Sequence, residues 1–335
     1  MHRARCNFAL AAMAALLAGL AAAAQAAPLD RAGLLKLADD YFAALVAHDP
    51  GKVPFAANAR FVENLKRTKP GDGLVWKTAS SVPTTFKLVI PDTESQEVGG
   101  IVVLGNGKDP TELGFRLKLE NGRITEAEHL VQGTRGGGPL NAGLAKVRPP
   151  MLVDVPYEYA DSRGRLIHIA RSYYDALDNN NGYLAPFAAD CERHENGMRT
   201  APNGGPSLAS MVPPAAAGGA APARAAPPVR LVGLQTCATQ IESGAFQYIT
   251  TIEDRRVEVA DTQTGLAMGF SHFHHAFTEH TFKIYGDPNR DDTTMDYQPF
   301  DMPALHVFKI WGGEIHEIEA IGVLGVPFNS PTGWE

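Results

Sequence analysis

Cysteine is scarce in this sequence, with only three among 335 residues. Cys6 lies in a start that is basic and then apolar and that ends in Ala24-Gln25-Ala26, an order typical of a secretory signal peptide cleaved after residue 26. Cys6 would leave with the signal, so Cys191 and Cys237 remain as an even pair. In an oxidising compartment such a pair favours a disulfide, and two cysteines alone exclude a structural zinc site.

Long apolar runs and basic stretches are also missing. No apolar run comparable to the first follows residue 26, so we expect no membrane-spanning helix after signal removal. The formal net charge of −7 is spread along the chain without an arginine-rich stripe, which argues against nucleic acid as a partner. The glycines at 136–138 lack the setting of a phosphate-binding loop. We therefore expect a secreted, periplasmic protein whose partner is a small molecule.

An internal repeat is visible in the sequence. Short patterns recur at a constant offset of 132 residues, and a second match joins a late segment of each copy. Each copy begins with a helical pattern followed by strand-like runs, which predicts α+β architecture with a curved antiparallel sheet and one concave face for a small molecule. The helical positions are Leu34, Leu37, Tyr41 and Leu45 in one copy and Leu166, Ile169, Tyr173 and Leu177 in the other.

The repeat gives the expected domain boundaries. Because roughly 310 mature residues suit two domains better than one, we expect a first domain at 27–132 and a second at 157–335 after the signal peptide at 1–26. The segment at 133–156 is rich in Gly and Pro and is interpreted as a linker. The Ala/Pro/Gly tract at 201–230 is interpreted as a disordered insertion without chemistry.

Several motifs of the second copy occur in a familiar order. They are Tyr-Tyr-Asp-Ala-Leu at 173–177, Pro-Phe-Ala-Ala-Asp at 186–190, Glu-Asn-Gly at 195–197 and Gly-Gly-Glu-Ile-His-Glu-Ile-Glu at 312–319. This order resembles the nuclear transport factor 2 superfamily, which includes SnoaL-like polyketide cyclases, ketosteroid isomerase and scytalone dehydratase. The resemblance implies two tandem cone-shaped barrels, each with helices packed in a curved antiparallel sheet.

A narrower resemblance rests on the motifs at 71–76, 255–261, 265–266 and 330–334, which are similar to an exported two-copy family common in fungi. Together the resemblances cover nearly the whole mature chain. They are specific for the fold and say little about activity, because this fold hosts enzymes and binding modules alike.

The two copies differ where the second has polar residues in place of apolar ones. We therefore expect the first copy to be a scaffold and any chemistry to lie in the second. The aligned pairs are Asp175 with Ala43, Arg193 with Phe61, and His194 with Val62.

The histidines of one predicted strand are the main candidates. Alternation along the strand puts Met268, Phe270, His272 and His274 on one face, and if that face lines the cone, both imidazoles point into it. His306 on a later strand is a further candidate. Three interpretations stay open: hydrogen-bonded core residues without chemistry, acid–base catalysis, and metal binding with an unidentified third ligand. The residues considered for that ligand are Glu279, His280 and His194.

Tyr174 and Asp175 form a second candidate pair. Scytalone dehydratase has a tyrosine followed by an aspartate near the end of its first helix, with two histidines deeper in the cone, and the resemblance implies a similar arrangement here. If Asp175 faces an apolar cavity, its pKa should rise.

The leading hypothesis is an exported, cofactor-independent lyase or isomerase that acts on a small, largely apolar, aromatic or polycyclic substrate. His272 and His274 would be base and acid, while Tyr174 and Asp175 would polarise the substrate oxygen or orient an imidazole. A non-catalytic protein that binds a hydrophobic ligand or a second copy of the chain is one alternative, and a metal-dependent enzyme is another. The residues expected to line the substrate site are Met268, Phe270, Arg193, His194 and His306.

Overall fold

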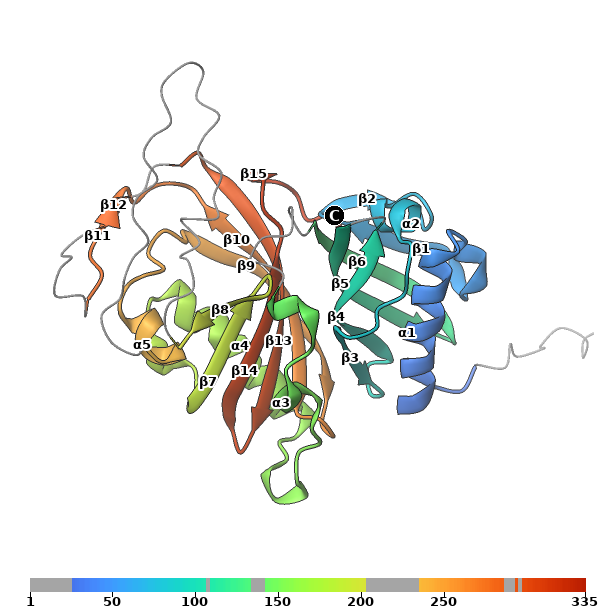
Figure 1. Cartoon of the computed structure of the whole chain (residues 1–335), viewed down its shortest axis with the longest axis horizontal. Helices are drawn as coiled ribbons and strands as arrows, with labels where there is room; N and C mark the ends of the chain where they lie inside the picture. The colour runs from blue at the N-terminus through green and yellow to red at the C-terminus, as the bar shows by residue number, and fades with distance from the viewer. Residues whose placement is uncertain (1–25, 107–108, 134–141, 203–234, 286–292, 295–296) are drawn as a thin grey trace, which may run out of the picture.

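The computed structural model describes residues 26–335 except 107–108, 134–141, 203–234, 286–292 and 295–296 (Figure 1). Nearly all of the expected signal peptide, part of the expected linker and nearly all of the expected insertion lie outside the described residues. In the part of the chain that is described, no helix is both long and apolar enough to span a membrane.

The first half of the described chain forms a six-stranded sheet with one long helix packed against it (Figure 1). Helix α1 (Arg31–Val46) begins after Asp30, whose carboxylate accepts a hydrogen bond from the Gly33 N–H and so satisfies a free donor of the first turn. The other elements are η1 (Pro50–Lys52), β1 (Phe55–Glu63), β2 (Lys66–Thr68), α2 (Leu74–Thr78), β3 (Lys87–Asp92), β4 (Glu97–Asn106), β5 (Asp109–Glu120) and β6 (Arg123–Gly133).

The second half has the same plan. Helix α4 (Arg163–Asp178) begins after Ser162, whose hydroxyl caps the Arg165 N–H. The sheet contains β7 (Phe187–Glu195), β8 (Met198–Ala201), β9 (Thr251–Asp261), β10 (Leu266–His275), β13 (Phe300–Trp311), β14 (Glu314–Gly322) and β15 (Val326–Pro327). Shorter elements are η3 (Gly143–Ala145), α3 (Pro149–Leu152), η4 (Tyr157–Tyr159), η5 (Gly182–Leu184), α5 (Cys237–Glu242), and the separate pair β11 (Thr281–Phe282) and β12 (Thr293–Thr294).

Strand order is identical in the two sheets: β2-β1-β6-β5-β4-β3 in the first and β8-β7-β14-β13-β10-β9 in the second. The mixed α+β class is therefore confirmed, and the arrangement is consistent with two copies of one pattern. The expectation of a purely antiparallel sheet needs correction, because β1 pairs with β6, and β7 with β14, in parallel. Strands β3, β4, β5 and β6 pair in succession, each antiparallel to the one before it. Strand β6 then lies beside β1 and runs in the same direction as β1.

Three large apolar clusters hold the described chain together. One lies between α1 and the first sheet and one between α4 and the second, and all eight predicted helical core positions are buried in them. The third joins the two sheets, with Ile101 and Leu130 on one side and Met268 and Phe270 on the other. Glycine permits this close approach, since a Cβ at Gly99 would lie 2.4 Å from Met268 Cε. Strand β10 is consequently buried on both faces.

Charged groups also join the halves. Arg256 of β9 donates two hydrogen bonds to Glu128 of β6, at 2.8 and 2.6 Å, and Arg163 of α4 donates to Asp92 of β3 at 2.8 Å. Both carboxylates are buried, and a bidentate guanidinium–carboxylate pair fixes orientation as well as distance. The two sheets are therefore held in one relative orientation.

Two acidic residues meet in the same contact. Glu112 of β5 and Glu319 of β14 are each 1% exposed. Burial raises the pKa of Glu319 to about 7, and burial together with the charge of Glu319 raises the pKa of Glu112. A carboxyl whose pKa is raised on folding contributes stability below its unfolded pKa, and that stability is lost as the pH rises through the folded pKa.

We expect Glu112→Gln to stabilise the protein more at pH 8 than at pH 5. The variant removes the share of this loss that comes from Glu112, whose pKa is raised by burial and by the charge of Glu319. Each unit by which folding raises a pKa corresponds to about 1.4 kcal/mol. Urea unfolding of wild type and variant across this range measures the difference. Glu120→Gln, an exposed change on the same strand, is the control and should show no such trend. Parallel pH curves for wild type and Glu112→Gln would contradict the assignment.

Candidate functional site

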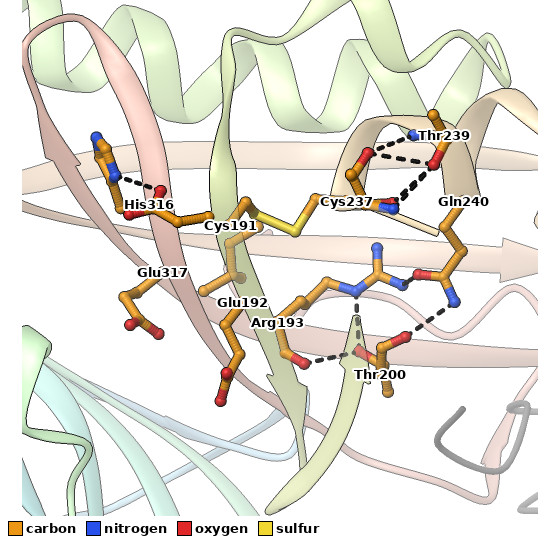
Figure 2. Close-up of a disulfide and its surroundings, with 12 residues drawn as sticks. Cys191, Glu192, Arg193, Thr200, Cys237, Thr239, Gln240, His316 and Glu317 are labelled. Carbon is orange, nitrogen blue, oxygen red and sulfur yellow. Dashed lines mark hydrogen bonds and ion pairs between the residues drawn. A yellow bond between two sulfur atoms is a disulfide. The ribbon is translucent and has the colours of Figure 1, made fainter. Parts of the chain in front are cut away.

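A disulfide joins Cys191 of β7 to Cys237 of α5 (Figure 2), which confirms the predicted pairing. Arg193, two residues further along β7, reinforces the link. Its Nη2 donates to the side-chain oxygen of Gln240 in α5 at 2.7 Å, and its Nε donates to the Thr200 hydroxyl of β8 at 2.9 Å. Helix α5 is thus fixed on the sheet, and the chain that leaves it forms a wall of the cavity described next.

A narrow cavity lies between α4, the segment after α5 and the second sheet. Its volume is about 30 Å³, enough for about one or two water molecules. Most of its lining is apolar or aromatic, including Phe246, Ile249 and Phe273, and its polar lining includes Tyr173 and His306. An aromatic or polycyclic substrate is larger than this narrow cavity.

His306 and Tyr174 form a buried hydrogen-bonded pair beside the cavity. The Tyr174 hydroxyl lies 3.3 Å from His306 Nδ1 and also 3.3 Å from the Gly269 carbonyl oxygen. Burial, with the positive charge of Arg193, lowers the pKa of His306 to about 3, while burial raises that of Tyr174. Both groups are therefore uncharged at neutral pH.

A hydroxyl between two acceptors permits two tautomers of the imidazole. If the Tyr174 proton points to Gly269, Nδ1–H of His306 donates to the phenol oxygen and Nε2 is a proton acceptor. If the proton points to Nδ1, Nε2 carries the ring hydrogen and is a donor. The pair can therefore accept or donate a proton at Nε2.

His272 and His274 lie on the other face of the second sheet. Their rings are 4.5 Å apart, and both contact Asp301 of β13: His274 Nδ1 is 2.7 Å from Oδ1, and His272 Nε2 is 3.3 Å from Oδ2. His272 lies with Phe270 against residues of the first half and does not line the cavity. Burial, with the neighbouring charge of His274, lowers the pKa of His272. The structure thus brings the two histidines together but separates them from Tyr174.

Asp175 is also outside the cavity. Its side chain is 57% exposed on α4 and accepts a hydrogen bond from Arg255 of β9 at 2.7 Å. His194 points away from Arg193 and its Nε2 contacts Glu192 at 2.7 Å. Of the residues expected to line the substrate site, only His306 lines this cavity; Arg193 is buried behind it, and Met268 and Phe270 pack between the sheets.

The aligned positions of the first half are apolar. Phe42 and Phe115 stand where the second half has Tyr174 and His306, and their rings meet edge to face at 5.1 Å, as the later pair does at 5.4 Å. An apolar pair of the first half is thus replaced by a hydrogen-bonded one in the second. The first half keeps a different Tyr–His contact, between Tyr41 and His129 at 2.8 Å.

A family model described as a domain of unknown function (DUF8021) matches residues 27–131 and 159–322. The chain belongs to this family. The two matched stretches contain the two large sheets with α1 and α4. No curated protein matches the chain.

Solved structures similar to this chain have low identity to it. A provisionally assigned ketosteroid isomerase from Kribbella flavida DSM 17836 is 15% identical over 34% of this chain and 88% of its own, with a TM-score of 0.25. AusH from Aspergillus nidulans is 10% identical over 49% and 88%, with a TM-score of 0.28. An NTF2-like protein from Burkholderia thailandensis E264 is 13% identical over 47% and 90%, with a TM-score of 0.24.

Sequence reasoning did not identify Tyr173 and Glu195 as cavity residues, nor Asp301 as a partner of the histidines. Tyr173 is one of the predicted helical core positions and Glu195 belongs to the Glu-Asn-Gly motif, and both also line the cavity. The signal for the Tyr174–His306 pair was present in the repeat, as two polar residues aligned with two phenylalanines. No comparable signal pointed to Asp301. It meets the histidines because β13 pairs with β10, and the sequence does not show which distant strands pair.

Proposed function

We propose that the second half is a cofactor-independent lyase or isomerase in which His306 and Tyr174 move the proton. The observation that carries this proposal is that a hydrogen-bonded imidazole–phenol pair lies at the cavity, where the first half has Phe115 and Phe42. Positioned imidazoles of this kind contribute to proton transfer in many enzymes.

In the proposed reaction the imidazole of His306 takes up one proton and gives one back, so no other proton donor or acceptor is required. Nε2 of His306 takes a proton from the carbon next to a substrate carbonyl, and the resulting imidazolium returns it. Return to another carbon moves the double bond, and transfer to a β-hydroxyl releases water. Tyr173, which lines the cavity and whose pKa burial raises to about 12, would donate a hydrogen bond to the carbonyl oxygen where negative charge develops.

The low pKa of His306 narrows the substrate class. A neutral imidazole with a pKa of about 3 is a weak base and a strong conjugate acid. Its strongly acidic conjugate acid favours protonation of a leaving hydroxyl, as in the loss of water from a β-hydroxy ketone. The volume of the cavity means that only the reacting end of such a substrate enters, unless the wall that carries Phe246 and Ile249 moves.

The fold and location belong to the same proposal. We propose two tandem cone-shaped domains at 27–132 and 157–335, supported by the identical strand order of the sheets. We also propose export, supported by the disulfide, because such bonds persist in oxidising compartments.

The test uses the aldol of benzaldehyde and acetone, which forms benzylideneacetone when it loses water. We expect the chain in D₂O to accelerate both deuterium incorporation next to the ketone and the rise in conjugated absorbance. A probe that binds, as judged by quenching of aromatic fluorescence, but neither exchanges nor eliminates would favour the alternative of a hydrophobic-ligand-binding protein.

A further inference from the structure

The His272–His274–Asp301 cluster has the geometry of a metal site. Each of the three side chains offers one ligand atom, and these atoms all lie within 4.8 Å of one another. In the register of β10 and β13, His274 is directly opposite Asp301, and His272 is two residues away on the same face. Two paired strands therefore supply all three groups, and strands hold ligands more firmly than loops do.

The cluster leaves a buried ring nitrogen without a partner. The His272 side chain is 3% exposed, and its Nε2 has no hydrogen bond within the described part of the chain. It lies near Asp301 Oδ2, but that oxygen already accepts from the Ser330 N–H at 2.8 Å. A buried nitrogen without a partner is costly, and a cation placed among the three groups would satisfy it.

Asp301 is a buried carboxylate with no fixed cation beside it. Its side chain is fully buried, and its ion-pair partners among the described residues are the two imidazoles alone, without Lys or Arg. Buried carboxylates are normally paired or bind metal. Because no Lys or Arg pairs with this carboxylate among the described residues, a divalent ion would supply a fixed positive charge beside it.

The ligand types indicate the kind of ion. Imidazole nitrogen with carboxylate oxygen suits Zn²⁺ and the neighbouring first-row ions, whereas Ca²⁺ and Mg²⁺ prefer oxygen alone. Glu253 Oε2 lies 3.7 Å from Nε2 of His274, the ring nitrogen that points away from Asp301, and can orient the imidazole as an outer partner. We propose that His272, His274 and Asp301 bind one divalent transition-metal ion, with water at the open position. The ion would replace the proton now shared by His274 and Asp301.

This site is independent of the proposed lyase or isomerase, since it lies on the opposite face of the sheet from His306. The test starts from the chain dialysed against a chelator and then titrated with CoCl₂ and, in a separate calorimetric experiment, with ZnCl₂. We expect one equivalent to bind and the Co²⁺ visible spectrum to intensify, as happens when water ligands are replaced in a low-symmetry site.

His274→Gln should weaken binding by at least about 100-fold, because even the outer partners of metal ligands are worth about 10–100-fold. His316→Gln is the matched control. His316 Nδ1 lies 2.7 Å from Asp190 Oδ1, the same distance as in the His274–Asp301 pair, but His316 is not part of the three-residue cluster. This variant should bind the ion as wild type does.

Failure of the wild-type chain to bind Co²⁺ or Zn²⁺ at millimolar concentration would overturn the proposal, as would equal affinity in the two variants. Asp301→Asn is a second variant that keeps the volume and removes the charge, and it should also weaken binding. If neither variant folds, Co²⁺-shifted proton resonances of the wild type decide the matter. Two imidazoles must be shifted if the proposal holds.

Discussion

Replacing His306 by phenylalanine is expected to lower turnover of the benzaldehyde–acetone aldol by at least about 100-fold, the lower end of what a positioned acid–base group contributes. Phenylalanine is the residue at the aligned position of the first half, where it packs against Phe42. It should fill the space of the imidazole, and its ring cannot exchange a proton. Initial rates of benzylideneacetone formation measure the loss.

Tyr174→Phe and Tyr41→Phe separate a chemical effect from a structural one. Each removes a buried hydroxyl that contacts a buried imidazole, at 3.3 Å from His306 in one case and at 2.8 Å from His129 in the other. We expect similar losses of stability, but a loss of turnover only for Tyr174→Phe. Equal turnover in the two variants, or an unchanged rate in His306→Phe, would show that the pair does not move the proton.

Replacing both disulfide cysteines by alanine is expected to lower the free energy of unfolding by about 4 kcal/mol, the chain-entropy value for a loop of this length. Cys191 and Cys237 are 46 residues apart in sequence, and both are buried. The loss should also loosen α5 and the cavity wall that follows it. Turnover should therefore fall together with stability.

Reductant supplies the control for this prediction. Wild type in dithiothreitol should approach the stability of the Cys191→Ala/Cys237→Ala double variant, which should itself not respond to reductant. Urea denaturation with and without dithiothreitol measures both. If the oxidised wild type and the double variant unfold at the same urea concentration, the disulfide does not stabilise the fold.

The sequence was sufficient to place the two long helices and the disulfide. Apolar residues at helical spacing predicted the buried faces of α1 and α4, and the even cysteine pair left after the expected export predicted the pairing. The same helical spacing could have placed Asp175. It lies two residues from the inward Tyr173, about 200° around the helix, and therefore on the outer side.

The sequence was not sufficient to place the strand histidines. Alternation correctly put His272 and His274 on one face of β10, with their rings 4.5 Å apart. Alternation could not show whether that face is turned toward α4 or toward the first sheet, because both faces of the strand are buried. Phe273 packs toward α4, and Phe270 packs toward the first sheet. Alternation identifies a solvent side only where one side is polar.

In each sheet an early strand pairs in parallel with a late one, so the order of synthesis decides when each sheet can be completed. Strands β1 and β6 both lie within residues 55–133, so the first sheet can close early. Strand β7 must wait for β14, which spans Glu314–Gly322 near the end of the chain. During that interval one edge of β7 has unpaired backbone groups and is open to other chains. Aggregation of the nascent protein would therefore begin in the half that is proposed to carry the chemistry.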